Sequence, residues 1–457
     1  MDVGFETVGN ATVICYDEKP VLVTDPWLEG NPYFGSWALT HEIPAEQLEA
    51  IKNCKFVWVS HGHPDHLSMP SLKQLQNNTI LLPEHVGGRI DGELRGLGFN
   101  VTILKDRVWT ELSPRIHVIC IPDYNQDAVL LVDVDGTLVV NLNDASPRGW
   151  GPFVQKMARQ YKTSVLLEQF GYGTTDMINF FDEGGARIEP RAALRIPIGE
   201  IIARVADTFG VSHAIPFSSH QKYQRADSVW ANEYITPLDA YGEGFQSKGC
   251  ELLPAFMSYD GDKKEFAEIN PAETPDVMVD PTEFGDDWSQ QLEKREVERL
   301  NAYFKSIEHL GRVVDFITVK VGGKDNIVTL RDRKFEKGIV FEVPRRSLMR
   351  AIRFETFDDL LIGNFMKTTL IGKWPQSHLY PDFTPYVTKY ADNGLAKTSE
   401  DLKRYFQEYR HRAPLDYLRH RIQLNVASVV RSRVNNRSRP YQFAQKAWWM
   451  ANKRLSP

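Results

Sequence analysis

One short run constrains this chain more than any other feature. The run His61–His66 reads HGHPDH and directly follows an apolar segment, Phe56–Ser60, which is typical of a buried strand. A loop at the end of a strand can turn several side chains toward one point, and imidazole and carboxylate are good ligands for zinc, iron or manganese. The first two histidines can face one metal ion, while the Asp and the third histidine can face a second. A His-rich surface loop is a weaker interpretation of this spacing. The candidate ligands of the run are His61, His63, Asp65 and His66.

Around this run, short apolar segments alternate with helical or turn segments. The segments that favour strands are Thr12–Cys15, Val21–Thr24, Phe56–Ser60, Thr79–Leu82, Val101–Leu104, Ile116–Ile121, Val129–Val134, Thr137–Asn141, Ser164–Glu168 and Ala214–Phe217. Asp135-Gly136 is a strong hairpin signal, and Arg191–Phe209 has apolar residues at helical spacing. Strands that lead into helices, with ligands at the strand ends, favour a layered α/β sandwich.

A change in composition then divides the chain. Residues 258–287 are rich in Asp, Glu and Pro and lack apolar periodicity, which is typical of a linker. The segments that follow favour two helices and three strands, namely Trp288–Lys305, Arg312–Val321, Ile327–Arg331, Gly338–Val343 and Ser347–Arg353. We therefore expect a catalytic domain over residues 1–257, an acidic Pro-rich linker over 258–287, and an additional α+β domain over 288–457.

The C-terminal end is basic, since 425–457 contains no acidic residue. This tail could contact an anionic surface or substrate, but a solvated basic helix that packs on acidic parts of the same chain is the more ordinary interpretation.

Charge and composition exclude several classes of function. A net charge of −6 argues against a nucleic-acid binder, which would normally be basic. Four cysteines without a C-x-x-C pattern favour reduced, buried thiols. No stretch approaches the ~20 apolar residues of a transmembrane segment. We expect a cytoplasmic protein whose substrate is a small polar molecule.

The His-rich run resembles the signature of the metallo-β-lactamase superfamily. This resemblance implies an αββα sandwich with metal ions at the strand ends, and three later ligands. Asp144, which follows the Asp135-Gly136 hairpin, matches the bridging carboxylate, and His220 matches the distal His. Asp25 matches an early Asp that usually orients a metal-bound His or water. Asp65 and Asp144 are the expected catalytic residues.

The remaining superfamily ligand, a His before the hairpin, is absent from its place. Asp123 is the natural replacement, with Asn125 and Asp127 as alternatives. A carboxylate in place of an imidazole makes the site harder and more anionic, which favours iron or manganese over zinc. In this respect the chain resembles the carboxylate-substituted members of the superfamily, which carry a di-iron centre and activate dioxygen.

A closer resemblance is to the metallo-β-lactamase portion of the CMP-N-acetylneuraminate hydroxylases. The segments that carry it are His61–Leu72, Asp127–Val132, 141–148, Ile215–His220 and Phe357–Gly363. That family hydroxylates an acetyl group on a nucleotide-linked sialic acid, and it carries a Rieske iron–sulfur domain with C-x-H and C-x-x-H patterns. Neither pattern occurs in this sequence, so we expect a separate electron-transfer protein and do not carry the substrate over.

Three hypotheses follow. The first is an oxygenase with two iron ions, or iron and manganese, that uses dioxygen to hydroxylate a polar metabolite, sugar-derived or acylated. The second is a hydrolase of a phosphodiester, lactone or amide, in which two metal ions generate a bridging hydroxide. The third is a non-catalytic protein, against which the number of ligand-type residues argues.

Overall fold

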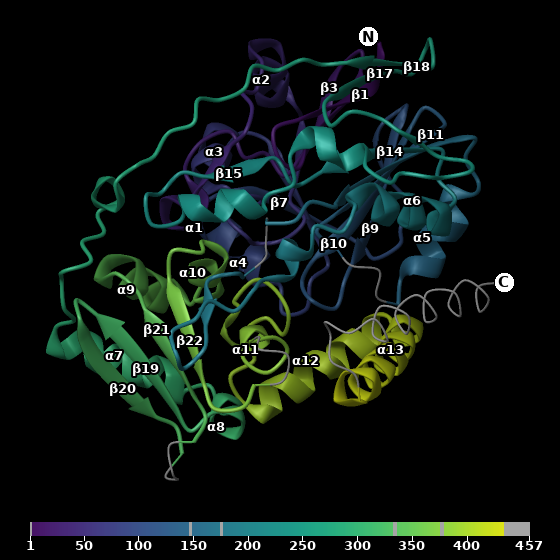
Figure 1. Ribbon diagram of the computed structural model, residues 1–457. Helices are drawn as coiled ribbons and strands as arrows, with labels where there is room; N and C mark the ends of the chain where they lie inside the picture. The colour runs from purple at the N-terminus through teal and green to yellow at the C-terminus, as the bar shows by residue number, and fades with distance from the viewer. Residues whose placement is uncertain (1, 146–148, 174–176, 332–335, 375–378, 434–457) are drawn as a thin grey trace.

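The chain fills two connected parts (Figure 1). The computed structural model describes residues 2–145, 149–173, 177–331, 336–374 and 379–433. Within these ranges no helix combines the length and the apolar character needed to cross a membrane. All four cysteines are free and buried, which confirms the sequence prediction.

The first large sheet carries the candidate metal loop. Its strands lie in the order β18-β17-β1-β2-β3-β5-β6-β7. Their bounds are β1 Val3–Val8, β2 Thr12–Asp17, β3 Lys19–Thr24, β5 Phe56–Trp58, β6 Thr79–Pro83, β7 Asn100–Leu104, β17 Met257–Asp260 and β18 Glu265–Glu268. Strands β3, β5, β6 and β7 pair parallel, and their connections include the helices α2 (Ala45–Asn53), α3 (Met69–Gln74) and α4 (Arg89–Gly96). The carboxyl ends of these parallel strands share one edge of the sheet, where open α/β sheets bind ligands.

The second sheet supplies the later candidate ligands. Its order is β16-β14-β12-β11-β10-β9-β8. The bounds are β8 Thr110–Ser113, β9 Ile116–Pro122, β10 Ala128–Val134, β11 Thr137–Asn143, β12 Thr163–Gln169, β14 His213–Phe217 and β16 Glu251–Leu252. Asp135 and Gly136 join β10 to β11 with φ of 47° and 84°, so the predicted two-residue hairpin is confirmed.

These two sheets pack face to face, and helices cover their outer faces. Along β10, Leu130 and Val132 enter the core between the sheets, whereas Val129 and Leu131 contact the helices outside. This alternation follows from the two-residue period of a strand that is buried on both faces. Helices α5 (Gly151–Ala158) and α6 (Ile198–Phe209) cover the second sheet, and α2, α3 and α4 cover the first. The predicted αββα sandwich is confirmed.

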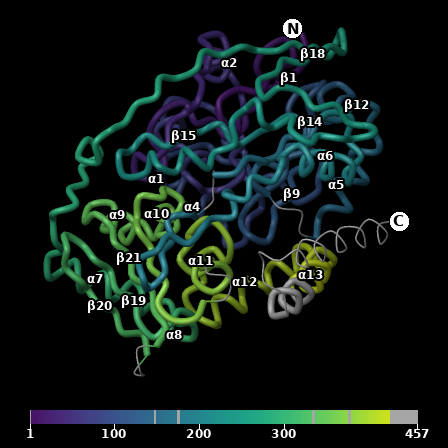
Figure 2. Tube along the Cα trace, in the orientation of Figure 1, coloured from purple at the N-terminus to yellow at the C-terminus, as the bar shows by residue number. Residues whose placement is uncertain are grey.

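The second part of the molecule is a smaller α+β unit with its own core. Its sheet has the order β13-β22-β21-β19-β20. The bounds in this part are α7 Lys294–Lys305, α8 Leu310–Val313, β19 Phe316–Val321, β20 Lys324–Thr329, β21 Gly338–Glu342, α9 Arg345–Phe354, α10 Asp358–Ile362, β22 Lys367–Ile371, α11 Thr384–Val387, α12 Ser399–Arg412 and α13 Pro414–Arg433. One strand, β13 (Phe180–Phe181), comes from the first half of the chain and pairs with β22. Figure 2 shows the trace passing between the two parts.

The structure corrects the start of the predicted linker, residues 258–287. Residues 258–268 form most of β17 and β18, which extend the first sheet at its edge. The acidic residues Glu265 and Glu268 are exposed on that edge strand, and charged side chains on an edge oppose pairing with other chains. The acidic composition of residues 258–268 is therefore that of a sheet edge and not of a linker. The following residues run along the outside of the molecule to α7 (Figure 1).

Two predicted helices begin later than the periodicity suggests. Within Arg191–Phe209, α6 starts only at Ile198, because Pro197 cannot continue a helix from the preceding turn. The helix predicted from Trp288 starts at Lys294, where Glu293 and Glu296 form a capping box. Residues 434–457, which hold most of the basic tail, lie outside the described part, so the contacts expected of the tail stay a prediction.

Candidate metal centre

The His-rich run forms a loop between β5 and α3 that folds back into the protein. His61, Asp65 and His66 are buried, and the His63 side chain is 15% exposed. The backbone N–H of Ser60 donates to Asp25 Oδ1 at 2.8 Å, which ties the start of the loop to the end of β3. The loop therefore directs ligand-type side chains inward from the carboxyl end of a parallel strand, as its position in the sequence predicts.

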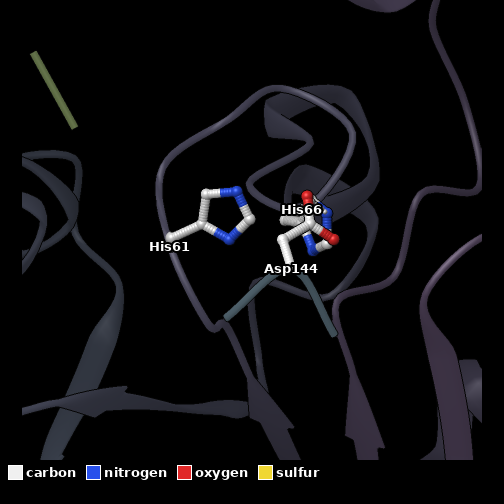
Figure 3. A group of neighbouring side chains, drawn as sticks. All are labelled: His61, His66 and Asp144. Carbon is white, nitrogen blue, oxygen red and sulfur yellow. Dashed lines mark ion pairs between the residues drawn. The ribbon is translucent and has the colours of Figure 1, made fainter. Parts of the chain in front are cut away.

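The structure brings three of the predicted ligands into one group. His61, His66 and Asp144 each offer a donor atom, and these atoms all lie within 4.8 Å of one another. Figure 3 shows the His61 ring extending from the loop toward the other two side chains. Asp144 reaches the group because it directly follows β11, the strand that continues from the predicted hairpin.

The second half of the loop surrounds His66 with carboxylates. Its Nε2 lies 3.3 Å from Asp65 Oδ2 and 3.5 Å from Asp144 Oδ2. Two donors bound to one ion at about 2.0–2.2 Å with tetrahedral geometry lie roughly 3.4 Å apart. The other ring nitrogen, Nδ1, lies 3.1 Å from Asp25 Oδ2. This position suits the orienting role that the sequence predicts for Asp25.

The first half of the loop brings two imidazoles together. His61 Nε2 and His63 Nδ1 lie 2.8 Å apart. The other ring nitrogen of His61, Nδ1, lies 3.3 Å from Asp127 Oδ1 and 2.9 Å from Ser60 Oγ. The outer nitrogen of His63, Nε2, lies 3.3 Å from Asp358 Oδ2. Each ring therefore turns one nitrogen toward the other imidazole and the second toward a carboxylate.

A pair of carboxylates lies at the turn between β9 and β10, where the sequence analysis looks for the third-motif ligand. The Asp123 N–H donates to the Asp127 carbonyl at 2.7 Å, so both residues lie at the base of one tight turn. Of the two, Asp127 carries the carboxylate that contacts His61, while Asp123 Oδ1 accepts from the Tyr124 N–H. No described contact joins Asn125 to the group. The geometry thus favours Asp127, which the sequence analysis kept as an alternative to Asp123.

His220 lies next to the group, but its ring is turned away in the structure. The backbone N–H donates to Asn10 Oδ1, and Asn10 Nδ2 donates to Asp65 Oδ2 at 3.1 Å. The ring Nε2 lies 3.2 Å from the Pro216 carbonyl, and the ring packs 5.1 Å from that of Phe256. Its Nδ1 is buried without a hydrogen-bond partner among the described residues. The role of His220 as the distal ligand stays a prediction.

The charges in this group fit bound cations. Burial, with the neighbouring Asp144 carboxylate, raises the pKa of Asp127 well above its usual range. Burial alone would lower the pKa of His66, but the carboxylates of Asp65, Asp144 and Asp25 raise it well above its usual value. Buried carboxylates that crowd in this way are relieved by a positive charge. Together with the donor spacing, this charge pattern fits a site for metal ions.

Several neighbours of the group could not be found from motifs alone. The Tyr33 hydroxyl donates to Asp65 Oδ1 at 2.6 Å, and the Ser218 hydroxyl donates to Asp144 Oδ1 at 2.6 Å. Ser218 lies two residues before the predicted ligand His220, and this closeness in sequence is a weak indication that it lies near the group. No ligand-type spacing in the sequence marks Tyr33 or Asp358, although Asp358 belongs to a segment that resembles the hydroxylases.

A cavity of about 500 Å³ lies between the two parts of the molecule, beside the turn that carries Asp127. His85 and Gln126 line it from the first part, and Tyr390 and Arg404 line it from the second. A Cβ atom at Gly62 would clash with the Tyr390 side chain, so the glycine of the loop is required by this close approach. The cavity has charged side chains of both signs, which suits a polar molecule.

No protein-family model matches the chain. Over 173 residues the chain is 29% identical to the cytidine monophosphate-N-acetylneuraminic acid hydroxylase of Mus musculus, which covers 36% of this chain and 29% of that protein. It is 27% identical to the inactive human (Homo sapiens) hydroxylase over 172 residues, 36% of this chain and 33% of that protein. The chain therefore matches less than half the length of these relatives. The resemblance seen in the sequence is confirmed over this segment.

Two solved structures are similar at low identity. The isothiocyanate hydrolase from Delia radicum gut bacteria has a TM-score of 0.38 and 15% identity, covering 56% of this chain and 98% of that chain. The metallo-beta-lactamase fold protein YhfI from Bacillus subtilis has a TM-score of 0.32 and 10% identity, covering 55% of this chain and 92% of that chain. TM-scores of this size do not on their own establish a shared fold.

Proposed function

We propose that this protein is a dinuclear metalloenzyme, and that it is an oxygenase with two iron ions, or iron and manganese, that acts on a polar small molecule. The observation that carries the proposal is the carboxylate-rich donor set, in which Asp127 contacts His61 where the superfamily places an imidazole. Oxygen donors favour iron or manganese over zinc. The four cysteines, whose thiolates would favour zinc, lie in hydrophobic cores away from the loop. When bound, iron would supply the redox chemistry that activates dioxygen.

The proposed ligands fall into two sets. One set is His61, His63 and Asp127, with Asp123 as the alternative third member, and the other is Asp65, His66, Asp144 and the predicted distal ligand His220. Hydrogen bonds from Tyr33 and Ser218 fix the orientation of Asp65 and Asp144, the two residues proposed as catalytic. Because these carboxylates are largely buried, their interactions with a bound cation would be stronger than in water.

The cavity between the two parts supports a polar small-molecule substrate, sugar-derived or acylated. Its volume of about 500 Å³ falls within the usual range for small-molecule sites. Lysines and arginines line it together with acidic residues, so a substrate with several polar groups could be held there. In this proposal the electrons come from a separate electron-transfer protein.

Parallel reconstitution with different metals tests the proposal. Metal-free protein would be loaded anaerobically with ferrous iron, manganese or zinc, and its metal content and absorption spectrum would be measured before and after exposure to oxygen. We expect two metal ions per chain with iron, and a change in absorption when oxygen is admitted. The zinc-loaded protein is the matched control and should show no such change.

The competing function is a hydrolase of a phosphodiester, lactone or amide. Tighter binding of two zinc ions than of iron, with full turnover of such substrates in the absence of oxygen, would contradict the oxygenase proposal and support the hydrolase.

A further inference from the structure

Helix α10 joins the C-terminal unit to the metal loop. Phe357, just before the helix, is fully buried in the core of the C-terminal unit. At its other end, Ile362 packs with Tyr33 and Trp37 of the first part, and the Gly363 carbonyl accepts from Ser36 Oγ at 2.8 Å. The helix is therefore anchored in both parts of the molecule, which fixes the side chains that it presents to the loop.

One of these side chains lies behind His63. Asp358 is 3% exposed, and its Oδ2 atom lies 3.3 Å from His63 Nε2. The opposite nitrogen of the same ring, Nδ1, lies 2.8 Å from His61 Nε2. The ring of His63 is thus held between a buried carboxylate of the C-terminal unit and the donor cluster of the first part.

The same arrangement is repeated at another imidazole of the loop. Asp25 lies 3.1 Å from the outer nitrogen of His66. A carboxylate behind a metal-binding imidazole fixes its tautomer and orientation and raises its basicity. Asp358 differs from Asp25 in its origin, since it lies 295 residues after His63.

We propose that Asp358 is a positioning residue for His63, so that the C-terminal unit completes the metal centre. The inference rests on the proposed metal centre and adds to it an obligatory contribution from the second half of the chain. Asp358 holds the His63 ring with Nδ1 directed at the metal and Nε2 protonated. Loss of such a partner typically lowers metal affinity by about 10–100-fold.

Metal affinity, measured independently of activity, tests this role. The full-length apo-protein and its variants would be titrated with zinc and with ferrous iron against a chromophoric chelator. The Asp358→Asn variant keeps the shape of the side chain. Its affinity for one of the two bound metal ions should fall about tenfold. Asp358→Ala should cause a larger fall, because the alanine leaves His63 Nε2 without an acceptor. Cobalt loading provides a second readout, since the absorption of the bound cobalt should change in both variants.

The matched control is Asp359→Asn, which changes the neighbouring carboxyl of the same helix without removing the His63 contact. Burial and the Asp358 carboxylate raise the pKa of Asp359 well above its usual range, so this substitution changes little charge. Its metal affinities should stay within about twofold of the wild type, well inside the tenfold effect expected at Asp358. Wild-type affinity for both metal ions in Asp358→Asn would overturn the inference, even if Asp358→Ala did not fold. An equal loss in Asp358→Asn and Asp359→Asn would also overturn it, by showing a general effect of changes in this helix. Failure of the wild-type protein to bind metal would instead contradict the proposed function.

Discussion

Two imidazoles of the candidate metal centre have a carboxylate on their outer nitrogen. Asp25 lies behind His66, and Asp358 lies behind His63. The inner nitrogens face one another or the carboxylates of Asp65 and Asp144. At the scale of single residues, carboxylates around the centre therefore fix the orientation of its imidazole rings before any metal binds.

The position of the third-motif ligand gives a prediction at this scale. Asp127 contacts His61, whereas Asp123 caps the Tyr124 N–H in the same turn. We expect Asp127→Asn to lower the affinity for one metal ion by about 10–100-fold, and Asp123→Asn to have a smaller effect. Elemental analysis of the two variants purified side by side is the measurement. The reverse ranking would assign the ligand to Asp123, as the sequence first suggested.

The residues that the sequence could predict are those fixed by local chain geometry. The run His61–His66 and Asp144 each follow directly on a strand end, so a pattern a few residues long locates them. The choice between Asp123 and Asp127 could not be made in this way, because one turn places both at its base. The orientation of the His220 ring depends on packing against Phe256, which no local pattern encodes.

Elements were predictable where their apolar period was strong. The buried strands of both sheets appear close to their expected positions, because their side chains are buried on both faces or alternate regularly. The short edge strand β18 and its neighbour β17 were missed, since the exposed acidic side chains of β18 resemble a linker. Helix starts were misplaced where a proline or a capping box overrides periodicity, as at Pro197 and Glu293.

The start of α9 gives a prediction about stability. Asp286 is 1% exposed; its carboxylate accepts from the Ser347 N–H in the first turn of α9 and from Arg225 Nη1 at 2.8 Å. Arg225 itself is fully buried and belongs to the first part of the molecule. Asp286→Asn leaves a buried guanidinium without one of its anionic partners, so we expect the free energy of unfolding to fall by about 3–5 kcal/mol.

Urea denaturation of the two proteins measures this loss. The neighbouring variant Asp287→Asn is the matched control, because the side chain of Asp287 bonds only to Ser289, two residues later, among the described residues. Its unfolding midpoint should change much less. Equal midpoints for Asp286→Asn and the wild type would show that the buried ion pair does not stabilise the junction.

At the scale of the whole molecule, the C-terminal unit covers the metal loop. Tyr390 packs on Gly62, Asp358 contacts His63, and Arg412 of α12 donates to the Asp123 carbonyl. These contacts join residues about three hundred positions apart, which is why the sequence predicted two domains but not their shared site. The account therefore describes one centre that is built from both halves of the chain.

The presence of two metal ions at this centre is the central claim, and anomalous X-ray diffraction from crystals of the metal-loaded protein tests it most directly. We predict two anomalous peaks, one about 2.0–2.2 Å from the nitrogens of His61 and His63, the other at that distance from Asp65, His66 and Asp144. Stoichiometric metal in the crystals with no anomalous peak at these residues would contradict the account.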